Sequence, residues 1–429
     1  MSESDDAAKR PRRSVARTAG LAGAVLGFAA AGVAAGVALE RYVVGRGRSV
    51  PDPYAHEPFG ELPADETRTV AINGSGAEQS STEHEQVDLH VEIVEPTGGR
   101  PDLTVVFVHG FCLDMGTFHF QRRRLAELDD PRVRMVFYDQ PGHGQSGRLA
   151  AGEYSLTALG DGLLQVIAEV APRGPLVLVG HSMGGMTIMA LAEQQPELFA
   201  ERVVGVSLIS SSAGGLDKVN FGLPELLAKV RRPLMPVLTS VNRLSPTMID
   251  RARRVSSDLA WLLTRRYGFG GESPSPALVS YVEQMNSTTS VDVIVAYVRT
   301  IFEHLRYDAL ANLLGIETLV IAGDKDLITP LEHSEEICRL LPGAELVVVE
   351  NGGHVALLEF HEQVSDELVE FLGRAARASA AAAPPLSLSG RRTRKPRKRL
   401  ADRWSRLRGK QRKPAKRPDD ASYPEQEAQ

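Results

Sequence analysis

The chain has 429 residues, of which 43% are hydrophobic and 24% are charged, which is ordinary for a globular protein with a sizeable buried core. This composition excludes a chain that is disordered throughout, and two cysteines, Cys112 and Cys338, are too few for a disulfide framework or a four-cysteine zinc site. The net charge of -5 combines a dense run of Lys and Arg over residues 391–417 with a remainder that is clearly acidic, so the two parts are interpreted separately.

Residues 1–45 are basic and contain residues 18–39, a run of 22 residues without a charged side chain. A helix of this length can cross a bilayer, although much of the run is Ala and Gly. The leading interpretation is a single-pass anchor. A cleaved signal peptide and an alanine-rich surface helix are the alternatives, and the pair Arg12-Arg13 loosely resembles a twin-arginine export signal. We expect a membrane-associated or exported protein of the bacterial cell envelope, and a cytoplasmic location stays open.

Residues 46–86 are rich in Pro, Gly, Ser and acidic side chains and are predicted to be a linker that contains at most one isolated strand. From residue 87 to 375, short apolar runs alternate with helix-like patterns, which predicts an α/β fold with a mostly parallel central sheet and helices on both faces. The runs that predict strands are 90–94, 104–108, 133–138, 176–179, 203–209, 318–322 and 346–349. One gap is too long for a crossover, and it predicts an inserted helical cap over about residues 213–312. Residues 376–429 are expected to form a basic, disordered tail.

The segment Gly180-His181-Ser182-Met183-Gly184-Gly185 stands between a predicted strand and a helix-like pattern. A strand, a tight turn with a serine between two glycines, and then a helix form the nucleophile-elbow pattern. The glycines are needed because the serine backbone is strained there, and a β-carbon two residues away would collide with the turn. The string alone is a weak signal, and its place at a strand-helix junction is what indicates a nucleophile at Ser182. A structural turn serine is the alternative.

A serine hydroxyl is a weak nucleophile, so it needs a base within hydrogen-bond reach and a carboxylate that orients the base. One loop directly after a predicted strand carries Asp324 and Asp326, and a loop after the last predicted strand carries His354. Both loops leave the sheet edge from which the elbow leaves, so their side chains can converge on Ser182. His354 is therefore the candidate base, and both aspartates are candidates for the acid.

Acyl transfer also needs an oxyanion hole, whose N–H groups are each worth about 3 kcal/mol in the transition state. The backbone N–H of Met183, directly after Ser182, is the expected first donor. The second is expected from the loop after the first buried strand, where the backbone of Phe111 is the best candidate. His109 and His143 stand in turns beside the same edge, and we expect them to hold loops rather than to transfer protons.

Five short motifs stand at the expected strand ends. They are His109-Gly110-Phe111, Asp139-Gln140-Pro141-Gly142-His143-Gly144-Gln145-Ser146, Gly180-His181-Ser182-Met183-Gly184-Gly185, Gly323-Asp324-Lys325-Asp326 and Gly353-His354. Together they resemble the α/β-hydrolase superfamily, and they are especially similar to its bacterial lipase, esterase and cofactor-free haloperoxidase group. The resemblance covers residues 87–375 and implies Asp326 as the acid, Phe111 and Met183 as oxyanion donors, and a lid made from the insertion. A serine at the elbow argues against the related epoxide hydrolases and haloalkane dehalogenases, which use a carboxylate nucleophile there.

The sequence predicts a serine hydrolase that cleaves carboxylic, hydrophobic or lipid-like esters through an acyl-enzyme, with Ser182, His354 and Asp326 as its triad. Acyl transfer to another acceptor, perhydrolysis, and a non-catalytic, membrane-tethered ligand-binding protein are the alternatives. Several apolar cap residues are expected either to line an acyl pocket or to form the core of the cap. They are Trp261, Leu262, Leu263, Tyr281, Met285, Ile294 and Tyr297.

The expected partners are a small-molecule or lipid ester as substrate and a membrane through the N-terminal segment. The basic run 391–417 could bind anionic lipid by charge attraction. Specific binding of nucleic acid is not expected, because Trp404 is the only aromatic residue in that run. Metal-ligand spacings are absent from the sequence, and we expect neither a metal nor a cofactor.

Overall fold

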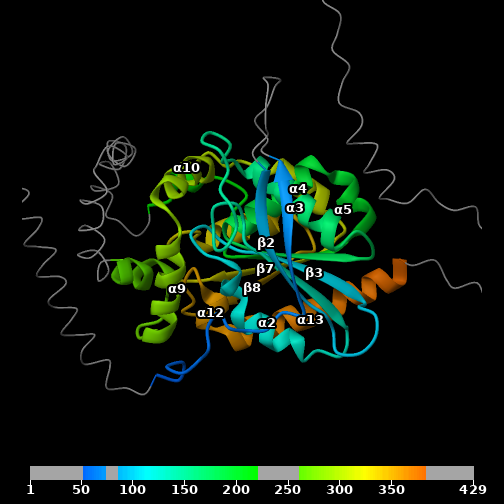
Figure 1. Cartoon of the computed structure of the whole chain (residues 1–429), viewed down its shortest axis with the longest axis horizontal. Coiled ribbons are helices and arrows are strands. Elements are labelled where there is room, and N and C mark those ends of the chain that lie inside the picture. The colour runs from blue at the N-terminus through cyan, green and yellow to red at the C-terminus, as the bar shows by residue number, and fades with distance from the viewer. Residues whose placement is uncertain (1–51, 74–85, 221–259, 383–429) are drawn as a thin grey trace, which may run out of the picture.

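The computed structural model describes residues 52–73, 86–220 and 260–382. Its strands are β1 (Glu66–Asn73), β2 (Gln86–Val94), β3 (Leu103–Val108), β4 (Val133–Tyr138), β5 (Leu176–His181), β6 (Val203–Ile209), β7 (Glu317–Gly323) and β8 (Glu345–Val349). In this part of the chain they form one eight-stranded sheet in the order β1-β2-β4-β3-β5-β6-β7-β8 (Figure 1). The strands from β4 to β8 in this order pair in parallel, while β1 and β2 join one edge antiparallel. The predicted α/β fold with a mostly parallel sheet is confirmed.

Helices cover both faces of this sheet, and others lie at the end toward which its parallel strands point. They are α2 (His119–Ala126), α3 (Leu156–Val170), α4 (Met183–Gln194), α5 (Pro196–Arg202), α9 (Pro276–Thr288), α10 (Val291–Phe302), α11 (Leu331–Leu340), α12 (Ala356–Glu359) and α13 (His361–Ala382), with short 3-10 helices η1 (Met115–Phe118), η2 (Leu216–Lys218) and η4 (Asp308–Leu313). Helices α3, α4 and α5 lie on one face, and α2, α12 and α13 lie on the other (Figure 1).

Strand β3 illustrates why the central strands are unbroken apolar runs. All six of its residues are buried. Val106 and Val108 pack in the hydrophobic cluster on one face of the sheet, while Val105 and Phe107 pack in the cluster on the other face. Successive side chains of a strand point to opposite faces, so a strand that is covered on both sides needs apolar residues at every position.

The N-terminal edge of the sheet differs from the expectation of a linker over residues 46–86. Residues 66–73 form β1, which pairs antiparallel with β2 along its whole length. Val70 and Ile72 point into the core, whereas Arg68 and Thr69 are exposed. β1 is an edge strand with one face toward solvent, so only Val70 and Ile72 carry the alternating apolar signal of a strand.

Residues 52–62, called here the N-terminal strap, connect the cap to the core. Asp52 accepts hydrogen bonds from Ser275 Oγ (2.7 Å) and the N–H of Ala277 (2.9 Å), at the start of α9. Farther along the strap, Phe59 stacks on Tyr281 of α9, with the ring centroids 4.4 Å apart. Rings of the strap also contact α2 and α13. The strap therefore packs on both the cap and the core.

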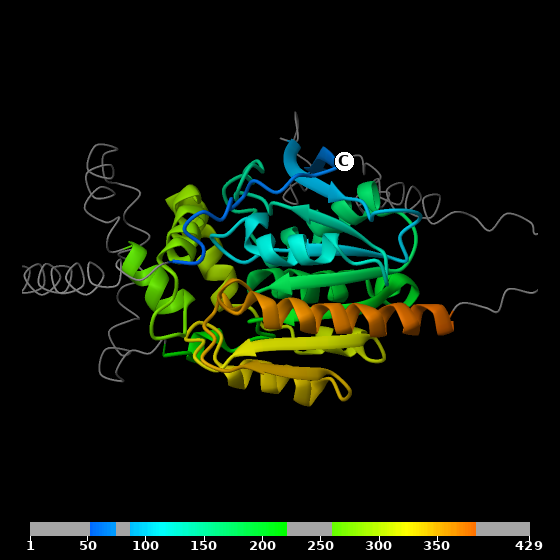
Figure 2. The ribbon, with the colours of Figure 1, turned by 90° about the horizontal axis from the view of Figure 1, so that it is seen from below.

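The described part of the predicted cap contains η2, a helical segment at residues 260–268, α9, α10 and η4. Figure 2 shows α9 and α10 at the end of the sheet toward which the parallel strands point. The cap residues 221–259, the predicted membrane segment 18–39 and the basic run 391–417 lie outside the described residues. Helix α13 continues to Ala382, past the predicted domain end at residue 375. No helix among the described residues is long and apolar enough to cross a membrane.

Candidate active site

Ser182 stands on the sharp turn between β5 and α4, as the elbow pattern predicts. Its backbone has φ 52° and ψ -118°, a strained conformation for a residue with a side chain. The turn leaves no room for a side chain at Gly184, where a β-carbon would lie 1.9 Å from the carbonyl oxygen of Val108. This turn holds the Ser182 hydroxyl at the carboxyl edge of the sheet, with 7% of the residue exposed.

The three predicted triad residues come together at this edge. His354 Nε2 lies 2.9 Å from Ser182 Oγ, and His354 Nδ1 lies 2.8 Å from Asp326 Oδ2. A carboxylate accepts hydrogen bonds, so Nδ1 carries the imidazole proton and Nε2 is left to accept the serine hydroxyl. Asp324, the other candidate acid, instead accepts a hydrogen bond from Lys325 Nζ at 3.0 Å. The arrangement therefore pairs the base with Asp326.

Besides His354, three other groups donate hydrogen bonds to the Asp326 carboxylate. Its Oδ1 accepts the N–H groups of Ile328 (2.8 Å) and Thr329 (3.0 Å), and its Oδ2 also accepts the Thr329 hydroxyl (2.8 Å). Burial alone would raise the pKa of Asp326, but His354 and the bonds from Thr329 outweigh it and hold this pKa below its usual value. The carboxylate stays ionised, as an orienting acid requires. Thr329 is not among the site residues that the sequence motifs predict.

His181, next to Ser182 in the chain, contacts the backbone of the candidate base His354. Its Nε2 lies 2.9 Å from the carbonyl oxygen of His354. Since a carbonyl only accepts, His181 Nε2 donates this bond. Burial lowers the pKa of His181 to about 3, so the ring stays neutral. His181 therefore acts as a hydrogen-bond donor to the backbone of the loop that carries His354.

The two predicted oxyanion donors are the backbone N–H groups of Phe111 and Met183. In the described part of the chain, the backbone N–H of Phe111 and that of Met183 donate to no acceptor. The next residue, Cys112, has a left-handed backbone with φ 59°, and its N–H donates to His143 Nε2 at 3.1 Å. His143 Nδ1 donates to the carbonyl oxygen of Pro141 at 3.1 Å, and burial lowers the pKa of His143 to about 4. The neutral ring therefore keeps Nε2 as an acceptor and holds the loop that carries Phe111.

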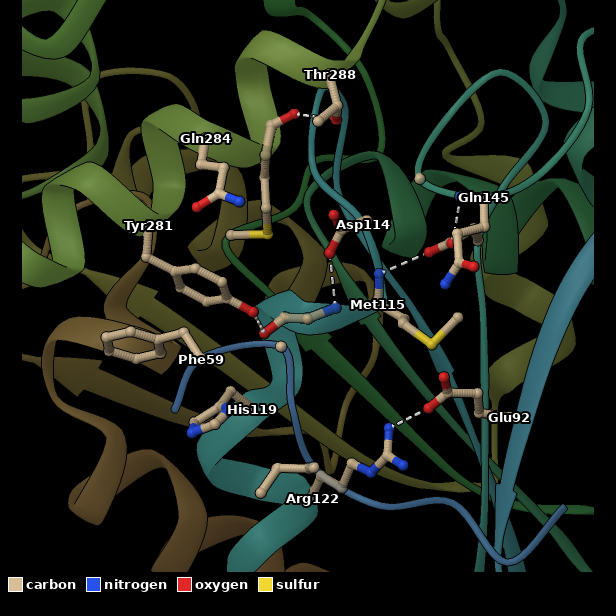
Figure 3. Close-up of a pocket in the computed structure, with 16 residues that line it drawn as sticks. Phe59, Glu92, Asp114, Met115, His119, Arg122, Gln145, Tyr281, Gln284 and Thr288 are labelled. Carbon is tan, nitrogen blue, oxygen red and sulfur yellow. Dashed lines mark hydrogen bonds and ion pairs between the residues drawn. The ribbon is translucent and has the colours of Figure 1, made fainter. Parts of the chain in front are cut away.

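Asp139 anchors the far end of the same loop. Its Oδ1 accepts the N–H of Met115 (2.9 Å), and its Oδ2 accepts the N–H of Gln145 (2.8 Å). Asp139 lines a cavity of about 280 Å³ between the N-terminal strap, η1 and α9 (Figure 3). Neither the triad nor the oxyanion donors line this cavity. Burial, with smaller contributions from the nearby carboxylates of Asp114 and Glu92, raises the pKa of Asp139 to about 7.

The cap residues predicted to line an acyl pocket divide between two places. Tyr297 packs in one apolar cluster with Met183, and its ring centroid lies 6.3 Å from that of Phe111. Tyr281 and Met285 pack in the cluster beneath the strap. Of the others, Trp261 packs against that second cluster, Leu262 and Leu263 line a separate cavity of about 440 Å³, and Ile294 is half-buried. Tyr297 is thus the predicted cap residue shown beside the oxyanion donors.

Two other kinds of chemistry find little support among the described residues. Burial raises the pKa of the Cys112 thiol to about 12, so the thiol is not ionised near neutral pH. No three His, Cys, Asp or Glu side chains in the described ranges are grouped so that they could hold a metal ion.

Comparisons with known proteins place this arrangement in a family. A family model described as the alpha/beta hydrolase fold matches residues 104–360. The chain is 27% identical over 278 residues to the dihydrolipoyllysine-residue acetyltransferase component of the acetoin cleaving system of Pseudomonas putida, a match that covers 64% of this chain but 65% of that protein. It is 26% identical to the pimeloyl-[acyl-carrier protein] methyl ester esterase of Nitrosospira multiformis, over 67% of this chain and 98% of the relative.

Among solved structures, a thermophilic esterase from Thermogutta terrifontis is 25% identical, with a TM-score of 0.53. That similarity covers 72% of this chain and 99% of the esterase. The family model spans Ser182, Asp326 and His354, and the observed sheet has the layout that the sequence motifs imply. The chain belongs to the alpha/beta hydrolase fold family.

Proposed function

We propose that this protein is a serine hydrolase that cleaves carboxylic esters through an acyl-enzyme. The observation that carries the proposal is the hydrogen-bonded series from Ser182 Oγ to His354 to Asp326, with distances of 2.9 and 2.8 Å. A nucleophile, a base and an orienting acid in hydrogen-bond contact are the parts that acyl transfer requires. A ligand-binding protein without catalysis has no need for a strained serine in contact with a base.

In the proposed reaction, Ser182 Oγ attacks the ester carbonyl carbon while His354 Nε2 takes the hydroxyl proton. The N–H groups of Phe111 and Met183 stabilise the oxyanion that forms on the carbonyl oxygen. His354 then gives its proton to the departing alcohol, and the acyl group stays on Ser182. A water molecule attacks this ester with His354 again as the base, and the acid leaves with Ser182 restored.

An ester with an apolar acyl group is the proposed substrate class. The apolar cluster beside the oxyanion donors contains Met183, Met186, Val293 and Tyr297 from the core and the cap, and it supports this choice. The names of two similar proteins, an esterase and a methyl ester esterase, support an ester as the bond that is cleaved. Membrane attachment through residues 18–39 and contact of the basic run 391–417 with anionic lipid remain predictions.

The proposal is tested by reaction with a fluorophosphonate probe, which labels only an activated serine. Wild type should be labelled, Ser182→Ala should not, and His354→Ala should react much more slowly. Ser280→Ala is a matched control, because Ser280 lies exposed on α9 and far along the chain from the elbow. A folded wild type that resists the probe would refute the proposal.

Hydrolysis of p-nitrophenyl acetate, butyrate and octanoate then measures the preferred acyl length. Repeating the assay with an added alcohol separates hydrolysis from acyl transfer, because transfer yields a new ester rather than free acid. The proposed hydrolase should give free acid as the main product, with the longer acyl chains favoured.

A further inference from the structure

The loop that carries His354 lies directly against residues 268–271 of the cap. The N–H of Val355 donates to the carbonyl oxygen of Gly268 at 2.9 Å. At Gly353, a β-carbon would lie 2.5 Å from both Gly268 O and Gly270 N. Only glycine allows two backbones to approach so closely, so the cap segment 268–271 and the base-carrying loop are in direct backbone contact.

The other side of this loop contacts the loop of the acid. The N–H of Lys325 donates to the carbonyl oxygen of Gly352 at 2.9 Å. A β-carbon at Gly323 would lie 2.2 Å from the same oxygen. The base-carrying loop is thus enclosed between the acid loop and the cap segment, and its position depends on both.

Glu359, the last residue of α12, joins the cap segment to this loop. Its Oε2 accepts the N–H of Gly353, directly before His354, and also the N–H of Gly270, both at 3.0 Å. Its Oε1 accepts the N–H of Gly271 at 2.8 Å. One half-buried carboxylate therefore receives three backbone N–H groups from two segments far apart in the sequence. Hydrogen bonds to a charged acceptor are about twice as strong as neutral ones.

We propose that Glu359 is a positioning residue for His354, and that through it the placement of the base depends on the docking of the cap segment 268–271. This inference rests on the proposed function, because it concerns the base of that reaction. When the segment is docked, its two N–H groups and that of Gly353 meet on one carboxylate, and His354 is held within reach of Ser182. Without the carboxylate, three backbone donors lose their acceptor, and the loop before His354 is no longer tied to the cap.

The coupling gives the cap an effect on the base in addition to the contacts with the acyl group that are proposed above. Geometry at the base is demanding, since a displacement of about 1 Å can reduce a rate by about a hundredfold. A substrate that moved the segment 268–271 would therefore change kcat as well as KM. A structural role alone would change only the stability of the fold.

The test compares Glu359→Ala and Glu359→Gln with the matched control Glu370→Ala, which removes a carboxylate from an exposed position on α13. For each full-length variant we would measure the melting temperature, kcat and KM on p-nitrophenyl butyrate, the pH profile of kcat/KM, and the rate of fluorophosphonate labelling. All assays are run well below the lowest melting temperature.

Glu359→Ala should lose about tenfold to a hundredfold in kcat and in labelling rate, with a shifted acidic limb of the pH profile. Glu359→Gln should fall between it and wild type, because an amide oxygen can still accept the N–H groups of Gly353 and Gly270 but the amide N–H opposes that of Gly271. Glu370→Ala should match wild type. Wild-type kcat and pH profile in Glu359→Ala, whatever its melting temperature, would overturn the inference.

If Glu359→Ala does not fold, Glu359→Gln decides by the same readouts, and a kcat equal to that of wild type again overturns the inference. Failure of the proposed function looks different. In that case wild type itself is neither labelled nor active, so the variants show no decrease in labelling rate or kcat.

Discussion

Asp326→Asn tests which nitrogen of His354 carries the proton, while the positions of the triad side chains stay unchanged. The backbone N–H groups of Ile328 and Thr329 both point at Oδ1, at 2.8 and 3.0 Å, so the asparagine must keep its carbonyl oxygen there. Its amide nitrogen then takes the place of Oδ2, next to the Thr329 hydroxyl and to His354 Nδ1. The hydroxyl can accept one amide proton, and we therefore expect the variant to fold.

The other amide proton donates to His354 Nδ1, which forces the imidazole proton onto Nε2. That nitrogen faces Ser182 Oγ at 2.9 Å and can no longer accept the hydroxyl proton. Loss of the correct tautomer lowers kcat by about 10⁴ in a serine-protease triad, which corresponds to about 5 kcal/mol of transition-state stabilisation. We expect a fall of about this size here, with KM little changed, because Asp326 is buried and faces His354.

Steady-state hydrolysis of p-nitrophenyl butyrate, with circular dichroism to confirm folding, measures the effect. Asp324→Asn is the matched control, since Asp324 lies two residues away and pairs with Lys325 instead of the base. It should keep wild-type kcat. A loss of less than about tenfold in a folded Asp326→Asn would refute the reasoning, because His354 would then not depend on Asp326 for its tautomer.

Two further predictions concern the loop that carries the oxyanion donor. His143→Leu removes the acceptor of the Cys112 N–H and should lower kcat about tenfold to a hundredfold, with KM little changed. His143→Gln should keep most of kcat, because its amide oxygen can replace Nε2 as the acceptor. Kinetics equal to wild type in the leucine variant would contradict this prediction. The raised pKa of Asp139 means that its contribution to stability is fully present below a pH of about 4 and is lost as pH rises toward about 7. In urea titrations, the free energy of unfolding should therefore fall more steeply with pH in wild type than in Asp139→Asn, by about 1 kcal/mol per pH unit, and parallel pH dependences would count against it.

How far the fold could be predicted depended on how much of each strand is buried. β3 is covered on both faces, so its apolar run was sufficient to place it. β1 has one neighbour and one exposed face, and Val70 and Ile72 alone give too short an alternation to identify a strand. The N-terminal strap was missed for a different reason. Its place is set by partners such as Ser275 and Tyr281, which lie more than 200 residues later in the chain.

The same distinction holds at the candidate site. Ser182, Asp326 and His354 each follow a recognisable strand, and the carboxyl ends of parallel strands meet at one edge, so their convergence followed from the motifs. Thr329 and Glu359 carry no such signal. The role of Glu359 depends on a cap segment 89 residues earlier in the chain lying beside the base, which no local pattern reveals.

The hydrogen bonds of Asp52 to the start of α9 also limit how far the cap can lie from residues 18–39. The 12 residues 40–51 separate Asp52 from the uncharged run 18–39. An extended chain spans at most about 3.6 Å per residue, so the end of that run and the cap can be no more than about 45 Å apart. If residues 18–39 lie in a bilayer, this limit keeps the cap close to the membrane surface. The far edge of the sheet can then lie farther from the membrane. Esters dissolved in that bilayer would then have the shortest path to the cap.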